Sequence, residues 1–150
     1  MNAMSILLAT DGSPEALAAA EWLDRWVSPE SAEITVATVI SPPSLAWTGA
    51  SGYVIDADIY QKTYQEVMDE EREAAKSILE ETRGQLVQCQ PTHQEVLVGQ
   101  PARALVEYAK AHHVDLIVMG RRGHSALGNL MGSVSFGVLQ RSPVPVTIVS

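Results

Sequence analysis

The feature that most constrains the fold is an alternation of short apolar runs with longer segments of helical pattern. The apolar runs indicate strands, which we expect at residues 6–9, 33–40, 92–98, 114–119 and 144–149. The longer segments place apolar residues on one helical face and are expected as helices at residues 14–27, 58–83, 101–111 and 133–141. Strands separated by helices pair in parallel through right-handed crossovers. The alternation therefore predicts an open α/β sheet with helices on both faces.

Length and charge narrow the class of protein. The chain has 150 residues, enough for one domain with a sizeable core, and we expect a single domain over residues 1–150. Its formal net charge is −8, from 10 Lys and Arg against 18 Asp and Glu. Binding to nucleic acid or to an anionic membrane requires basic patches, so neither partner is expected.

The single cysteine, Cys89, bears on the compartment. One cysteine excludes an intrachain disulfide and fits a reducing environment. No apolar run approaches the length that spans a membrane, and no signal peptide precedes the first expected strand. We therefore expect a cytoplasmic protein.

A glycine pattern follows the fourth expected strand. The apolar run ends at Met119, two glycines follow at Gly120 and Gly123, and Gly132-Ser133 opens the next helix. Glycines at the end of a strand, followed by a helix start, let backbone N–H groups face a phosphate. The first N–H groups of that helix and its dipole add partial positive charge. This pattern predicts a nucleotide-binding site.

A polar cluster, Thr10-Asp11-Gly12-Ser13, follows the first expected strand. In open parallel sheets, ligands bind at the carboxyl ends of the strands where the strand order reverses. If the first and fourth strands are neighbours there, the cluster at 10–13 and the glycines at 120–123 face each other across one crevice. Residues 44–56 form the longest expected loop, and long loops in compact domains are often functional.

These segments, taken in order, resemble the universal stress protein family. The resemblance covers residues 5–149 and implies an open five-stranded parallel sheet with strand order 3-2-1-4-5. Five landmarks carry it: Leu8-Ala9-Thr10-Asp11-Gly12-Ser13, Val98-Gly99-Gln100-Pro101-Ala102, Asp115-Leu116-Ile117-Val118-Met119-Gly120, Gly132-Ser133-Val134 and Arg141-Ser142-Pro143-Val144-Pro145-Val146.

One branch of that family carries the pattern G-x2-G-x9-G-[ST] and binds ATP or a related adenine nucleotide. This chain is similar to that branch, although residues 124–131 between Gly123 and Gly132 are one fewer than the pattern has. The resemblance implies a stress-response or signalling module that binds ATP or AMP, with little or no hydrolysis. Mg²⁺ could accompany the phosphates, and Asp11 is the one candidate ligand for it.

The resemblance also assigns roles in binding. Asp11 would contact the adenosine part, and its carboxylate can accept from an amine or a ribose hydroxyl. Ala9 and Thr10 would line the same wall, and Val39 would pack on adenine. The residues expected around the ribose and phosphates are Met119, Gly120, Arg121, Gly123, Gly132, Ser133 and Val134. Arg122 would add charge there in the same way as Arg121.

Two alternatives to a nucleotide-binding module stay open. The shorter glycine segment leaves room for a nucleotide-independent dimeric interaction protein of the same fold. A slow ATPase is the less favoured alternative, because no residue stands out as a catalytic base. The chain carries no P-loop, no dinucleotide fingerprint and no zinc-ligand spacing.

The last expected strand, residues 144–149, bears on partners. It is apolar and would lie at the edge of the sheet, where unpaired backbone groups invite pairing with another chain. A two-fold dimer is the commonest closed solution. The family resemblance likewise implies a homodimer through this strand.

Overall fold

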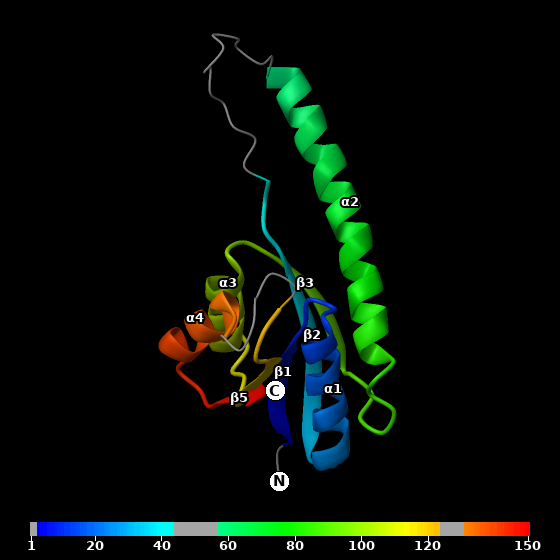
Figure 1. Ribbon diagram of the computed structural model, residues 1–150, viewed down its shortest axis with the longest axis vertical. Helices are drawn as coiled ribbons and strands as arrows, with labels where there is room; N and C mark the ends of the chain where they lie inside the picture. The colour runs from blue at the N-terminus through cyan, green and yellow to red at the C-terminus, as the bar shows by residue number, and fades with distance from the viewer. Residues whose placement is uncertain (1–2, 44–56, 124–130) are drawn as a thin grey trace.

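Five parallel strands form one sheet in the order β3-β2-β1-β4-β5, as expected (Figure 1). The computed structural model describes residues 3–43, 57–123 and 131–150. The expected loop at 44–56 and most of the segment between Gly123 and Gly132 lie outside the described residues. The strands are β1 (Met4–Ala9), β2 (Ala32–Ile40), β3 (His93–Val98), β4 (Leu116–Gly120) and β5 (Val146–Val149).

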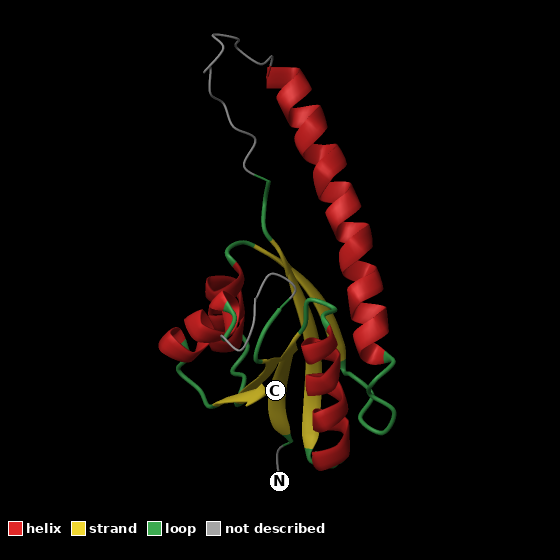
Figure 2. Ribbon diagram, viewed as in Figure 1, coloured by secondary structure: helices red, strands yellow, loops and turns green. Residues whose placement is uncertain are grey.

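Helices cover both faces of the sheet, as expected (Figure 2). On one face, α1 packs on β4 and β5, while α2 packs on β2 and β3. On the other face, α3 packs on β2 and β3, and α4 lies against α3 and β5. The helices are α1 (Pro14–Trp26), α2 (Ala57–Arg83), α3 (Pro101–Ala111) and α4 (Ser133–Arg141).

Local sequence signals place the helix starts. Proline opens both α1 and α3, where its fixed φ fits and its missing N–H is not needed. The Ser13 hydroxyl accepts from the Ala16 N–H at 3.2 Å and caps α1. The Gln100 side chain accepts from the Arg103 N–H at 2.7 Å and caps α3.

The core forms two layers because side chains alternate along the central strand β1. Ile6 and Leu8 are buried among residues of α1 and α2, whereas Leu7 and Ala9 are buried among residues of α3 and α4. The sheet is therefore covered on both faces. In open parallel sheets, ligands bind at the edge formed by the carboxyl ends of the strands.

The last strand is shorter than expected, since β5 begins at Val146 and not at Val144. The Ser142 hydroxyl donates to the Val144 carbonyl at 2.7 Å and accepts from the Val144 N–H at 3.2 Å. This local turn, followed by Pro145, holds the chain out of the strand until Val146. Nowhere in the described ranges is there a helix long and apolar enough to cross a membrane.

Candidate functional site

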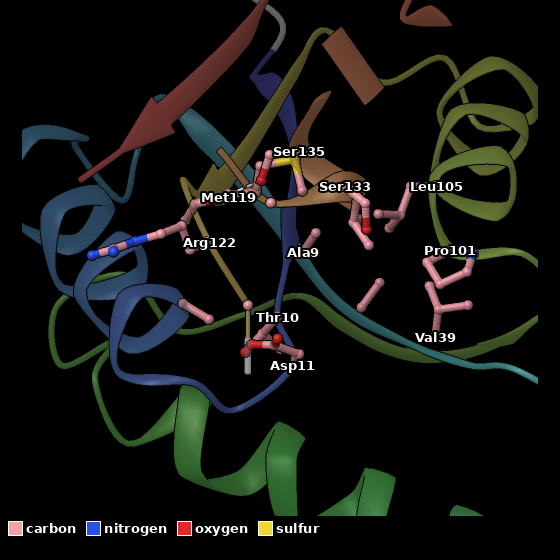
Figure 3. Close-up of a pocket in the computed structure, with 16 residues that line it drawn as sticks. Ala9, Thr10, Asp11, Val39, Pro101, Leu105, Met119, Arg122, Ser133 and Ser135 are labelled. Atoms are coloured by element: carbon pink, nitrogen blue, oxygen red, sulfur yellow. Dashed lines mark hydrogen bonds between the residues drawn. The ribbon is translucent and has the colours of Figure 1, made fainter. Parts of the chain in front are cut away.

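A pocket of about 240 Å³ opens at the carboxyl ends of β1 and β4, where the strand order reverses (Figure 3). The volume that the described residues enclose lies near the low end of ligand pockets, about 300 Å³. Ten of the eleven residues expected from the sequence line it: Ala9, Thr10, Asp11, Val39, Met119, Gly120, Gly123, Gly132, Ser133 and Val134. The eleventh, Arg121, is not among the lining residues; its neighbour Arg122 is.

The turn after β1 holds the carboxylate of Asp11 in a defined position. Asp11 Oδ1 accepts from the Ser13 N–H at 2.9 Å, which closes a local turn. Gly12 permits this turn because its φ is 76°, a left-handed value that favours glycine. The carboxylate therefore presents acceptor oxygens to the pocket from a short, hydrogen-bonded support.

The hydroxyl of Thr10 is tied to α2 behind the pocket. Thr10 Oγ1 lies 2.8 Å from Thr82 Oγ1, and Thr82 is fully buried. Thr82 donates its single hydroxyl proton to the Ile78 carbonyl at 2.8 Å, so Thr10 is the donor in the Thr10–Thr82 bond. The Gly12 N–H in turn donates to Thr10 Oγ1 at 3.1 Å. Toward the pocket, this hydroxyl can only accept.

The glycine that ends β4, Gly120, and the glycine that follows it, Gly123, have different effects on the packing. A Cβ added to Gly120 would lie 2.8 Å from the carbonyl carbon of Glu15, so Gly120 lets β4 approach the backbone of α1. A Cβ added to Gly123 would instead overlap Asp11 Oδ2. The backbone at Gly123 thus lies directly against the Asp11 carboxylate, and the two clusters face each other across one crevice as expected.

The start of α4 completes the pocket. The Gly132 N–H donates to the Arg121 carbonyl at 2.9 Å, and the Ser135 hydroxyl donates to the Gly120 carbonyl at 2.8 Å. Both bonds tie the first turn of α4 to the end of β4. The N–H groups of Ser133 and Val134 have no acceptor within their own helix and belong to residues that line the pocket. This end of the pocket suits an anion.

An ion pair between Arg122 and Glu15 was not expected from the sequence. The Arg122 N–H donates to Glu15 Oε2 at 2.8 Å, and Arg122 Nε donates to Glu15 Oε1 at 2.6 Å. A second guanidinium nitrogen also contacts Oε1. Hydrogen bonding to Arg122 holds the pKa of Glu15 below its ordinary value of 4.5, although burial opposes this shift.

The side of the pocket opposite Arg122 is apolar. In Figure 3, Val39, Pro101 and Leu105 lie on one side, while Arg122 lies on the other with its guanidinium directed away from them. Periodicity indicates Leu105 only as a core residue of α3, so its place in the pocket could not be anticipated. Ala16, Ala37, Pro101 and Ser135 are the further lining residues that were not assigned to the site from the sequence.

No group of three or more His, Cys, Asp or Glu side chains that could hold a metal ion occurs within residues 3–43, 57–123 and 131–150. Asp11 as a Mg²⁺ ligand therefore stays a prediction. Cys89 is buried, its thiol donates to the Val27 carbonyl at 3.1 Å, and desolvation raises its pKa.

Comparison with known proteins gives one consistent result. The sequence model of the universal stress protein family matches residues 3–150. Universal stress protein MJ0531 of Methanocaldococcus jannaschii is 30% identical over 146 residues, which cover 96% of this chain and 80% of the relative.

Two solved structures are similar over nearly the whole chain. The structure of hypothetical protein MJ0577 has a TM-score of 0.80 and 25% identity, and the match covers 97% of this chain and 94% of that one. A universal stress protein in complex with cAMP has a TM-score of 0.63 and 28% identity, and the match covers 99% of this chain and 98% of that one.

Proposed function

The chain belongs to the universal stress protein family, and we propose that its pocket binds an adenine nucleotide, ATP or AMP, as a stress-response or signalling module. The observation that carries the proposal is the meeting of the Asp11 turn, the glycine segment and the start of α4 in one pocket. The related protein solved with cAMP supports the same ligand class.

The chemistry of the pocket fits the three parts of such a ligand. Val39, Pro101 and Leu105 offer an apolar surface for the base. The Asp11 carboxylate can accept from an exocyclic amine or from ribose hydroxyls. At the start of α4, the N–H groups of Ser133 and Val134 can donate to a phosphate.

Little or no hydrolysis is part of the proposal. A hydrolase needs a base that can take a proton from water. One oxygen of Asp11 already accepts from the Ser13 N–H. The Glu15 carboxylate is bound to Arg122, which lowers its pKa and weakens it as a base. Any phosphate release is therefore expected to be slow.

The direct test is calorimetric titration of nucleotide-free protein with ATP, AMP and cAMP, each with and without Mg²⁺. Copurified nucleotide is identified in parallel by mass spectrometry. Saturable heat for an adenine nucleotide is the expected result, and a larger affinity for ATP with Mg²⁺ would support the ion as a companion. No heat with any ligand, and no copurified nucleotide, would favour the nucleotide-independent interaction protein.

The proposal includes a homodimer formed through β5 in a cytoplasmic protein. β5 pairs with β4 on one side and lies at the end of the sheet order, so its other edge can pair with a second copy. Light scattering after size exclusion should give twice the 16.2 kDa chain mass. A monomer at micromolar concentration would contradict this part of the proposal.

A further inference from the structure

The Glu15–Arg122 ion pair lies at the end of the pocket where we propose that a phosphate binds. From Gly120 to Gly132 the sequence carries two formal positive charges, Arg121 and Arg122, and no negative one. Of these two arginines, Arg122 is the one that lines the pocket. A chain with an unopposed arginine there would attract highly charged phosphates.

Glu15 opposes that charge through three contacts. Its Oε2 accepts from the Arg122 backbone N–H at 2.8 Å, and its Oε1 accepts from Nε at 2.6 Å and from a second guanidinium nitrogen. Both side chains are about a quarter exposed, at 31% for Arg122 and 21% for Glu15, so the pair is only partly screened by water.

The pair also fixes where the guanidinium lies. Glu15 is in the first turn of α1, and Figure 3 shows the Arg122 side chain directed away from Val39, Pro101 and Leu105. Asp11, Glu15 and Arg122 together carry one net negative charge, and Arg121, which does not line the pocket, adds one positive charge near Glu15. The Arg122 N–H is likewise engaged by Glu15, so it is not offered to a phosphate.

We propose that Glu15 is a specificity-determining residue: by holding Arg122, it makes the pocket select adenine ligands of low phosphate charge, such as adenosine, a cyclic nucleotide or a monophosphate, over the triphosphate. This inference rests on the proposed function and refines its ligand class. Glu15 acts by offsetting the charge of Arg122 and by holding its guanidinium, and it does not itself contact the ligand, so it is a positioning residue.

The test measures the affinities for AMP and for adenosine and compares their ratio between the wild-type protein and variants. A chelator is present in every titration to exclude Mg²⁺. Glu15→Gln keeps one acceptor oxygen for the Arg122 N–H, but its NH₂ group cannot accept from the guanidinium. Arg122 is then released, and a gain of one unit of charge about 8 Å from a doubly charged phosphate raises the ratio about fivefold at the dielectric constant of bulk water, which is the lower limit for this partly screened site. The ratio of affinities for ATP and adenosine should rise further, because the triphosphate carries more negative charge than the monophosphate.

Three further variants separate charge from structure. Arg122→Gln should lower the AMP-to-adenosine ratio about fivefold, and the double variant should return it near wild type. Glu21→Gln is the matched control, because Glu21 pairs with Arg25 on the same helix, about 9 Å further along its axis. It should leave the ratio unchanged. Each change in the AMP-to-adenosine ratio should become smaller when the salt concentration is raised from about 0.05 M to about 0.5 M, because salt screens the charges.

An unchanged ratio in Glu15→Gln, with adenosine still bound, overturns the inference. Equal weakening of all three ligands also overturns it, since Glu15 would then only support the loop. If Glu15→Gln does not fold, Arg122→Gln decides: a ratio that does not fall overturns the inference. If the wild-type protein binds no adenine ligand, the proposed function fails and the inference fails with it.

Discussion

Substituting Gly123 by alanine should weaken nucleotide binding without unfolding the protein. The added Cβ would overlap Asp11 Oδ2, so the carboxylate must turn away from its present position. The φ of Gly123 lies outside the left-handed range, so alanine introduces no backbone strain. The perturbation is therefore confined to the side chain proposed to contact adenosine.

Two magnitudes follow for this variant. A hydrogen bond to a charged group contributes about 1.5–3 kcal/mol, so losing the Asp11 contact should weaken binding about 10- to 150-fold. Losing the bond from the Ser13 N–H to Asp11 Oδ1 costs about 1 kcal/mol of stability. Replacing glycine returns about 0.4–1 kcal/mol through the unfolded chain. The free energy of unfolding should therefore change by less than about 1 kcal/mol.

The assay combines calorimetric titration with urea denaturation, for Gly123→Ala and for Gly84→Ala. Gly84 follows the end of α2 and does not line the pocket, so the second variant controls for the loss of a glycine. Its nucleotide affinity should equal that of the wild-type protein.

A double-mutant cycle tests whether the overlap of the added Cβ with Asp11 causes the loss of affinity. In an Asp11→Ala background there is no carboxylate to displace, so Gly123→Ala should cause no further loss of affinity. If Gly123→Ala weakens binding equally in both backgrounds, the overlap with Asp11 is not the cause. The proposed contact between Asp11 and the ligand would then have no support from this variant.

Three other expectations concern stability and are measured by urea or pH denaturation. Gly120→Ala should destabilise the fold by about 1–3 kcal/mol, because its Cβ would meet the backbone of Glu15; an unchanged unfolding midpoint would refute this. Thr82→Val should cost about 1–3 kcal/mol, since it leaves the buried hydroxyl of Thr10 without its acceptor, whereas Thr82→Ser should cost less. Because folding lowers the pKa of Glu15, its pairing with Arg122 stabilises the protein above pH 4.5 and is lost as the pH falls below that value. In Glu15→Gln, the free energy of unfolding should fall less steeply as the pH drops below 4.5. If it falls as steeply as in the wild-type protein, the pairing of Glu15 is not the source of this pH dependence.

Much of the fold could be predicted from the sequence because its signals are local. Apolar runs separated by helical patterns required a parallel sheet, and Pro14 and Pro101 marked helix starts that the structure confirms. The strand order came from resemblance to a family and is confirmed as well. The start of β5 was wrong by two residues, because a hydrogen-bonded turn at Ser142 competes with strand pairing.

With the strand order that the family resemblance implied, the sequence also predicted which segments meet in the pocket, since the carboxyl ends of neighbouring parallel strands share one edge of the sheet. Tertiary structure alone decided which of two adjacent arginines lines the pocket, because the chain bends after β4 and Glu15 of α1 holds Arg122 there. It alone paired Arg122 with Glu15 across 107 residues and Thr10 with Thr82 across 72. Such contacts depend on how helices pack on the sheet, and no local pattern encodes that packing.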